Sequence, residues 1–248
     1  MSRAIGAASA QAGEVVLQVR NLNAWYGRAH ILFDVNLEVH RGEVVALMGR
    51  NGAGKSTTMK ALMRLLERSS GSVVFRGEDI SHAKPHHVAQ RGLAYVPEDR
   101  RIFSDLSVLE NLEVGRQAPR AGAVTWSPQT LFELFPNLGE MPHRPGARMS
   151  GGEQKMLTVA RSLMGNPYLV LLDEPSEGVA PLIVEQMAGM ILALKHAGVS
   201  ILLSEQNLHF AALVSDRVCV LENGHLRYQG SMAQLAGDAS AQRAYLSV

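Results

Sequence analysis

The feature that most constrains this chain is a glycine-rich segment close to residue 50. It reads Gly49-Arg50-Asn51-Gly52-Ala53-Gly54-Lys55-Ser56 and continues with Thr57. The apolar run Val44–Met48 precedes it, and such a run is typical of a strand that is covered on both faces. After Lys55, apolar side chains recur at the spacing of one helical face, at Met59, Leu62, Met63 and Leu66. The sequence therefore predicts a buried strand, a glycine loop and a helix in direct succession.

This succession is the setting in which a loop of the pattern G-x-x-x-x-G-K-[S/T] binds nucleotide phosphates. Glycines allow backbone N–H groups to surround phosphate oxygens, and the N-terminus of the following helix adds partial positive charge. We expect Lys55 to contact the β- and γ-phosphates, Ser56 to offer its hydroxyl to Mg²⁺, and Thr57 to support the α-phosphate. The alternative is an ordinary glycine turn capped by a serine, which the matching strand and helix disfavour.

Two adjacent carboxylates follow a second predicted strand, Leu169–Leu172. Asp173 and Glu174 would then lie at the carboxyl edge of a sheet, where ligands of open α/β sheets bind. Asp173 is suited to orient Mg²⁺ or its water, and Glu174 to polarise the water that attacks the γ-phosphate. The alternative is a solvated acidic pair at the end of a strand, which is less favoured in a chain that also has a phosphate loop.

The segment Ser150-Gly151-Gly152-Glu153 precedes a predicted amphipathic helix. Ser followed three residues later by Glu forms a capping box, which alone would justify those two residues. The paired glycines are not required by a capping box, and they expose backbone at the start of a helix. They predict a second anion site, and therefore contact with a second nucleotide.

The remaining pattern indicates an α/β protein with an inserted helical segment. Val15–Val19 and Val35–Val39 predict an antiparallel sheet, and helical segments broken by prolines occupy residues 97–165. Strand–helix alternation resumes after residue 167, which predicts a mainly parallel sheet. Two further strands around Asn223-Gly224 predict a hairpin.

Composition excludes several classes of protein and site. The 24 Lys and Arg residues are balanced by 23 Asp and Glu residues, so nucleic acid is not an expected partner. The single cysteine, Cys219, excludes an internal disulfide and a multi-cysteine zinc site. His82, His86 and His87 have no acidic or cysteine residue to complete a metal site, and we expect them to be solvated. The chain has no apolar run long enough to span a membrane, and residues 1–13 lack the apolar stretch of a signal peptide. We therefore expect residues 1–13 to be a disordered extension of a cytoplasmic protein.

The phosphate loop, Met149–Glu153 and Asp173-Glu174, in that order, resemble the ATP-binding subunits of ABC transporters over residues 15–228. The resemblance implies one ATP-binding domain at residues 14–248. Its fold would be a P-loop NTPase core with a mainly parallel sheet, an antiparallel β subdomain and an inserted helical lobe at about residues 97–165. It also implies ATP hydrolysis with Mg²⁺ in a head-to-tail dimer, where Ser150, Gly151, Gly152 and Glu153 meet a nucleotide bound to the other subunit. Tyr26 would stack on adenine.

Three finer segments resemble the second ATPase subunit of branched-chain amino acid uptake systems: residues 96–103, 173–181 and 203–207. This resemblance implies membrane permeases as direct partners and an extracytoplasmic substrate-binding protein as an indirect one. It also implies a peripheral position on the cytoplasmic face of the plasma membrane.

Three positions depart from the general ABC pattern. Glu98 stands where most members have a Gln that senses Mg²⁺ and water, and a carboxylate there could ligate the metal. Ala180 replaces an Asp that contacts the other subunit. Gln206 replaces the switch His near the γ-phosphate, exchanging a side chain that can carry a proton for a neutral amide. We therefore expect a heterodimer with a sister subunit that carries the His, although a homodimer remains an alternative.

Other functions remain open at this point. A regulatory ATP-binding subunit with little turnover of its own is one, although Glu174 argues against it. An ABC ATPase acting on ribosomes or DNA is another, which the near-neutral charge disfavours. Within transport, the cargo could instead be urea or an amide, because the permeases and the binding protein select it.

Overall fold

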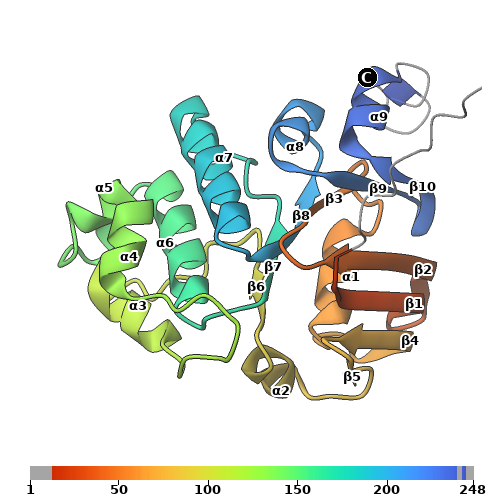
Figure 1. Ribbon diagram of the computed structural model, residues 1–248, viewed down its shortest axis with the longest axis horizontal. Helices are drawn as coiled ribbons and strands as arrows, with labels where there is room; N and C mark the ends of the chain where they lie inside the picture. Colours follow the sequence, from red (N-terminus) through yellow and green to blue (C-terminus); the bar gives the residue numbers. More distant parts are fainter. Residues whose placement is uncertain (1–12, 239–241, 244–248) are drawn as a thin grey trace, which may run out of the picture.

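Two β-sheets and their covering helices form the framework of the protein, as a computed structural model shows (Figure 1). The structure describes residues 13–238 and 242–243, so the predicted extension at residues 1–13 lies outside it except for Gly13. In these residues one sheet has the strand order β2-β1-β4-β5 and the other has the order β10-β9-β3-β8-β7-β6. The prediction of an α/β fold is confirmed.

The smaller sheet is antiparallel and opens the described part of the chain. Its strands are β1 (Val15–Tyr26), β2 (Ala29–His40), β4 (Arg68–Phe75) and β5 (Glu78–Asp79). β1 and β2 are longer than predicted, because register shifts let the pairing continue past polar residues such as Asn21, whose φ is 49°. β1 therefore extends to Tyr26, and its end reaches the phosphate loop.

The larger sheet carries the parallel strands. They are β3 (Val44–Met48), β6 (Leu93–Val96), β7 (Leu169–Asp173), β8 (Ser200–Glu205) and β9 (Arg217–Glu222). Every residue of β3 and β7 is buried, as their apolar sequences predicted. The antiparallel edge strand β10 (His225–Ser231) follows a tight turn in which Asn223 and Gly224 have φ angles of 48° and 77°. The predicted hairpin is confirmed.

Helix α1 (Lys55–Leu62) lies between the two sheets. Met59 and Leu62 are fully buried among strand residues of both sheets. The helix ends earlier than its apolar spacing predicted, because Arg64 has a φ of 59° and the chain turns away. Leu66 consequently lies beyond the helix and is only partly buried.

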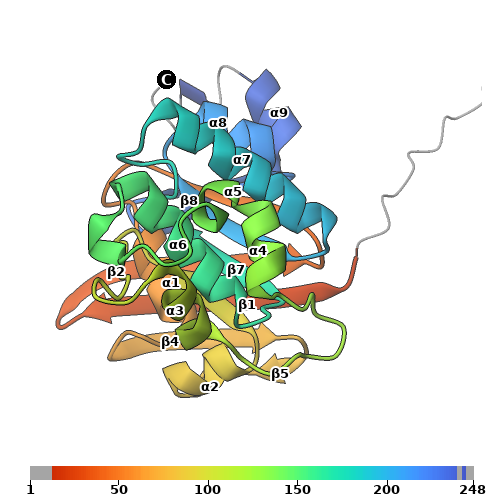
Figure 2. The same ribbon diagram turned by 90° about the vertical axis from the view of Figure 1, so that its left-hand side faces the viewer.

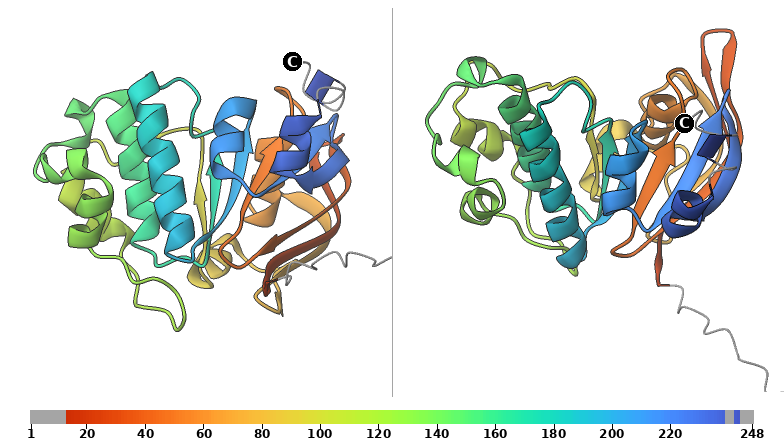
Figure 3. Two further views of the ribbon diagram at one scale, coloured as in Figure 1. Left: turned by 45° about the horizontal axis from the view of Figure 1, so that its top comes forward. Right: turned by 90° about the horizontal axis from the view of Figure 1, so that it is seen from above.

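Other helices cover the face of the larger sheet that points away from α1. α6 (Gly151–Leu163), α7 (Pro181–His196) and α8 (Leu208–Val214) pack on it, as Figure 2 shows from that side. α3 (Val108–Gly115), α4 (Pro128–Leu134) and α5 (Pro136–Gly139) gather with α6 at the end of the molecule away from the antiparallel sheet (Figure 3). The shorter helices α2 (Pro85–Gln90) and α9 (Met232–Gly237) complete the described elements with a 3₁₀ turn at Gly146–Arg148. The lobe boundaries near residues 97 and 165 stay a prediction.

The sheet order places the candidate site. β8 lies between β3 and β7, and all three are parallel, so their carboxyl ends share one edge. β3 ends at the phosphate loop, β7 at Asp173 and β8 at Glu205. Segments more than 100 residues apart in the chain therefore meet where ligands of α/β sheets bind.

Candidate functional site

The phosphate loop needs its glycines for its backbone path. Gly49, Gly52 and Gly54 have φ angles of 150°, 79° and 110°, which side-chain-bearing residues rarely adopt. A Cβ atom at Gly49 would lie 2.3 Å from the carbonyl oxygen of Leu221. Gly54 is also the N-cap residue of α1, whose first N–H groups lack acceptors within the helix. The loop thus combines a close backbone turn with N–H donors, as phosphate binding requires.

A cleft of about 430 Å³ opens at this loop. It is lined by eleven residues, which are Tyr26, Ile31, Asn51, Gly52, Gly54, Lys55, Ser56, Thr57, Glu98, Glu174 and Glu177. Seven of the fourteen predicted nucleotide-binding residues therefore line one cleft. Gly49 and Ala53 are buried in the loop beneath the cleft, whereas Arg50 is exposed.

Lys55 is buried at the base of the loop and makes three polar contacts. Its Nζ donates to the carbonyl oxygens of Gly49 at 2.8 Å and Arg50 at 3.3 Å. It also forms an ion pair with Glu174, with 3.0 Å between Nζ and Oε1. An anion entering the cleft would therefore compete with Glu174 for the Lys55 ammonium.

Glu174 combines burial, an unusual backbone angle and several donors. Its φ is 46°, and its backbone N–H donates to the backbone oxygen and to the Oγ of Ser204. The amide of Gln206 donates to Glu174 Oε2 at 2.9 Å. Burial works to raise the pKa of Glu174, but hydrogen bonds from Glu177, Lys55 and Gln206 outweigh it and lower the pKa. Glu174 is therefore held as a carboxylate, the form that can accept a proton.

Asp173 forms an oxygen-rich corner beside the cleft. Its Oδ1 accepts hydrogen bonds from the hydroxyls of Ser56 at 3.0 Å and Ser204 at 2.6 Å. Its Oδ2 accepts from Tyr95 at 3.0 Å, and burial together with the Asp173 charge strongly raises the pKa of Tyr95. The Ser204 and Tyr95 contacts were not predicted, although each residue lies one position before the end of a strand that pairs with β7.

These donors suit Mg²⁺, which prefers hard oxygen ligands and is commonly held by one or two carboxylates together with substrate phosphates. Ser56, Glu98 and Asp173 also line a second cleft of about 320 Å³ that adjoins the first. Within residues 13–238 and 242–243, no group of three or more His, Cys, Asp and Glu side chains is arranged as a metal site. A hydroxyl and two carboxylates are therefore the donor set that the protein offers here.

Glu177 also lines the cleft, and the sequence analysis did not identify it. Its hydrogen bond with Glu174 and the charge of that carboxylate raise the pKa of Glu177 to about 7. At neutral pH the protonated fraction of Glu177 donates to Glu174. No motif marked this residue, because its role depends on the chain turn after Glu174.

We expect the Glu177 carboxyl to make folding stability depend on pH. Between its ordinary pKa of about 4.3 and its folded-state pKa of about 7, the folded chain retains a proton that the unfolded chain loses. The free energy of unfolding should therefore fall as pH rises through this window. Glu174 has a lowered pKa, so its opposite effect lies below about pH 4.3. Denaturant unfolding at several pH values should give a flatter profile for Glu177→Gln, and identical slopes would contradict the assignment.

Tyr26 ends β1 and is 47% exposed at the mouth of the cleft. The neighbouring Trp25 is instead engaged by His30, with ring centroids 4.3 Å apart, and by the Arg68 guanidinium. This arrangement leaves the Tyr26 ring as the aromatic face available to a planar base. Its stacking on adenine stays a prediction.

Replacing Tyr26 with Ala should weaken ATP binding by about 5- to 150-fold, because stacking of a base on an aromatic ring contributes about 1–3 kcal/mol. Tyr26→Phe should retain most of the affinity, since the ring face is preserved. Fluorescent ATP titration would measure both variants. Equal affinities for wild type and Tyr26→Ala would show that adenine does not stack here.

Ser150 and Glu153 form the predicted capping box. Glu153 Oε2 accepts the backbone N–H of Ser150 at 2.7 Å, and Ser150 Oγ accepts that of Glu153 at 3.3 Å. The structure also gives the paired glycines a packing role: a Cβ at Gly152 would lie 2.7 Å from Ile183, and one at Gly151 would meet the Arg100 guanidinium. These packing neighbours are a local reason for the two glycines that the sequence analysis did not include. Contact of residues 150–153 with a nucleotide stays a prediction, and none of them lines the cleft.

Two buried charged residues behind the site were also missed. Glu205 accepts backbone N–H groups of Ser176 at 3.0 Å and Gln206 at 3.2 Å. Lys155 donates to the carbonyl oxygens of Glu174 at 2.5 Å and Glu177 at 3.1 Å. A signal for Lys155 was present, because it lies four residues before Val159 and therefore on the apolar face of α6.

Comparison with known proteins decides the family. Residues 32–177, more than half of the chain, match the family model described as ABC transporter. The chain belongs to the ABC transporter family. It contains the ATP-binding domain of such a transporter, which hydrolyses ATP, and ATP-binding domains of this family generally dimerise and associate with membrane permeases.

Individual relatives span the ABC domain almost completely. The chain is 39% identical over 231 residues to the high-affinity branched-chain amino acid transport ATP-binding protein BraG of Pseudomonas aeruginosa, covering 93% of this chain and 99% of BraG. It is 34% identical over 239 residues to the lipopolysaccharide export system ATP-binding protein LptB of Haemophilus influenzae, covering 93% and 97%. A nucleotide-free ATP-binding cassette of known structure matches with a TM-score of 0.79 at 25% identity, covering 92% of this chain and 97% of that one.

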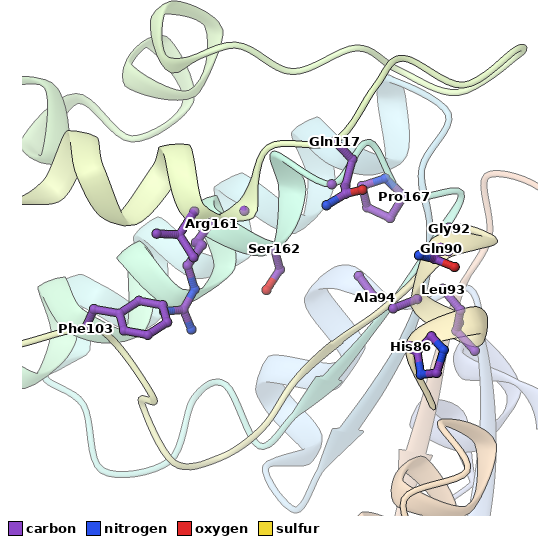
Figure 4. Close-up of a pocket in the computed structure, with 14 residues that line it drawn as sticks. His86, Gln90, Gly92, Leu93, Ala94, Phe103, Gln117, Arg161, Ser162 and Pro167 are labelled. Atoms are coloured by element: carbon purple, nitrogen blue, oxygen red, sulfur yellow. The ribbon is translucent and has the colours of Figure 1, made fainter. Parts of the chain in front are cut away.

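A second surface feature of this ABC domain is a groove of about 510 Å³ between α6 and β6. Figure 4 shows Phe103, Arg161 and Ser162 on one side and His86, Gln90 and Leu93 on the other. The Arg161 guanidinium lies 5.1 Å from the Phe103 ring centroid, and its Nη1 has no hydrogen-bond partner. The groove is therefore part apolar, with a donor left unsatisfied.

A helix that crosses a membrane needs about 20 mostly apolar residues. No helix within residues 13–238 and 242–243 combines that length with that apolar character.

Proposed function

We propose that this chain is the ATP-hydrolysing subunit of an importer for branched-chain or other hydrophobic amino acids. The observation that carries the proposal is the 39% identity to BraG over 99% of its length, against 34% identity to LptB. The segments at residues 173–181 and 203–207, which resemble the second ATPase subunit of such importers, support the same substrate class.

The geometry supports a separate role in ATP hydrolysis for each of the residues at the cleft. Backbone amides of the loop and the Lys55 ammonium would bind the phosphates, and Ser56, Asp173 and Glu98 would hold Mg²⁺, which neutralises phosphate charge when bound. Glu174 would accept a proton from the attacking water while the γ-phosphate separates from ADP. Gln206 holds Glu174 by a hydrogen bond, so its role would be to orient that carboxylate.

We propose further that ATP lies between two subunits in head-to-tail order. Residues 150–153 line no part of the cleft in their own chain, so a nucleotide they contact would be bound to another subunit. Ala180 is the N-cap residue of α7, where its side chain forms no capping hydrogen bond, and it offers no polar side-chain group across such an interface. These features suit a dimer in which the second subunit is a sister ATPase with its own switch His.

This arrangement predicts unequal sites. Gln206 cannot carry a proton near the γ-phosphate, whereas the His of a sister subunit can. The chain assembled with its sister should therefore hydrolyse ATP several-fold faster per site than the chain alone. Steady-state ATPase assays at equal total site concentration would measure this. Undiminished activity of the isolated chain would contradict the asymmetry.

The groove between α6 and β6 is our proposed docking place for a permease. It is large enough for side chains of a partner helix, and the Arg161 guanidinium that lines it would donate a hydrogen bond to a carbonyl or carboxylate oxygen of that helix. This partner would hold the chain at the cytoplasmic face of the membrane. The extracytoplasmic binding protein would act through the permeases without touching the chain.

Reconstitution tests the substrate class. The chain would be purified with its permeases and sister subunit, and its ATPase activity measured with binding protein loaded with leucine, urea or no ligand. We expect several-fold stimulation by the leucine-loaded protein alone. Stimulation by urea alone, or loss of lipopolysaccharide export on gene deletion with amino acid uptake intact, would reject an amino acid importer.

A further inference from the structure

Lys155 is a buried ammonium whose position the proposed chemistry leaves unexplained. It lies in the first turns of α6 and is 4% exposed. Its Nζ donates to the main-chain oxygens of Glu174 at 2.5 Å and of Glu177 at 3.1 Å. An ammonium so removed from water is costly unless its hydrogen bonds are satisfied, and these two carbonyls supply part of that compensation.

The two carbonyls flank the turn that carries the proposed base. Glu174 has a φ of 46°, a conformation that a residue with a side chain adopts only when its surroundings hold it. The N–H of Glu177 bonds back to the Glu174 carbonyl at 3.3 Å, which closes the turn. Lys155 therefore holds both ends of the turn, while Gln206 and Lys55 hold the carboxylate itself.

Lys155 also reaches this turn from a particular helix. It lies three residues after Gly152, about 4.5 Å along the helix axis, and α6 begins at the Ser150–Gly152 segment that would meet the other subunit's nucleotide. Burial lowers the pKa of the Lys155 ammonium, and the charges of Glu205, Glu98 and Glu177 act in the opposite direction. The start of α6 and the proposed base are thus joined within one chain by one side chain.

We propose that Lys155 is a positioning residue for hydrolysis, which fixes the main chain of Glu174 from the helix that bears Ser150–Gly152. The proposal rests on the role of Glu174 given under the proposed function. Lys155 is not among the residues that line the cleft at the phosphate loop. Its effect should therefore fall on the chemical step and leave ATP binding unchanged.

Lys155→Met tests this, because methionine keeps most of the volume and loses the ammonium. Lys195→Met is the matched control. Lys195 lies near the C-terminal end of α7, about 20 Å along the helix from its start at Pro181, and pairs with Asp216. Three quantities would be measured on the chain assembled with its ATPase partner: the melting temperature, the single-turnover rate of hydrolysis, and the ATP retained after gel filtration in a Glu174→Gln background.

We expect Lys155→Met to slow single turnover by about 10- to 100-fold, the range expected for a misplaced reacting group. ATP retention in the Glu174→Gln background should stay within about two-fold of the parent, and Lys195→Met should change neither quantity. A rate within two-fold of wild type would overturn the proposal. Parallel loss of rate and retention would also overturn it, by showing that Lys155 only shapes the start of α6.

The single variant Glu174→Gln distinguishes failure of the role proposed for Lys155 from failure of the role proposed for Glu174. If that variant hydrolyses ATP normally, the role of Glu174 fails, whereas normal turnover by Lys155→Met with an inactive Glu174→Gln rejects only the role of Lys155. If Lys155→Met does not fold, Lys155→Gln is read by the same criteria. Its amide keeps a donor but is too short to bridge both carbonyls.

Discussion

Replacing Glu174 with Gln will reduce steady-state ATP turnover by at least about 100-fold, because a positioned general base contributes about 10²- to 10⁴-fold to a reaction. Gln matches the size of Glu but cannot accept a proton from water. The variant also removes the negative partner of Lys55, which lies 3.0 Å from Glu174 Oε1, so the ammonium becomes fully available to phosphate. ATP should therefore bind at least as tightly as in the wild type and remain bound between the two subunits of the proposed head-to-tail dimer.

Phosphate release and ATP retention would be measured on the same preparation. Glu113→Gln is the matched control, since Glu113 lies on α3 in a surface pair with Arg116. An exposed pair of this kind contributes little, so the control should keep wild-type turnover. Normal hydrolysis by Glu174→Gln would falsify the role assigned to this carboxylate.

Replacing Lys55 with Met will weaken ATP binding by at least about 30-fold, which corresponds to about 2 kcal/mol for the loss of a buried charge-assisted contact. The change also leaves the buried Glu174 carboxylate without its cation, so the folded state should lose stability. Calorimetric ATP titration and denaturant unfolding would measure the two effects separately. Lys195→Met should change ATP affinity by less than two-fold.

The double variant Lys55→Met/Glu174→Gln distinguishes the two consequences. Removing both charges should restore part of the stability lost in Lys55→Met, because no unpaired carboxylate remains. ATP affinity should stay low, since the ammonium is still absent. Recovery of ATP binding in the double variant would show that Lys55 acts only by neutralising Glu174 and makes no contact with phosphate.

The sequence predicted which residues form this site more completely than it predicted how those residues are arranged. The phosphate loop and Asp173-Glu174 were recognisable because each needs specific residue types beside a buried strand. Pairing of Lys55 with Glu174 joins residues 119 positions apart in the chain. It depends on which strands are neighbours and on side-chain conformation, which local patterns do not determine.

Local periodicity also misled where tertiary packing overrode it. β1 runs through Asn21 to Tyr26 because register shifts absorb the interruption, and α1 stops at Leu62 although apolar residues continue. The glycines at 151 and 152 have packing neighbours from distant segments. Lys155 and Glu177 acquire their roles from the turn after Glu174, which no pattern in the sequence describes.

Titration of Mg²⁺ and ATP into folded Glu174→Gln protein, followed by isothermal calorimetry, tests most directly that the cleft at the phosphate loop binds ATP. The cleft contains the amides of the loop, Lys55 and the exposed ring of Tyr26. We predict saturable heat with one ATP bound per chain, and its loss in the Lys55→Met/Glu174→Gln variant. Absence of saturable heat from correctly folded protein would contradict the account.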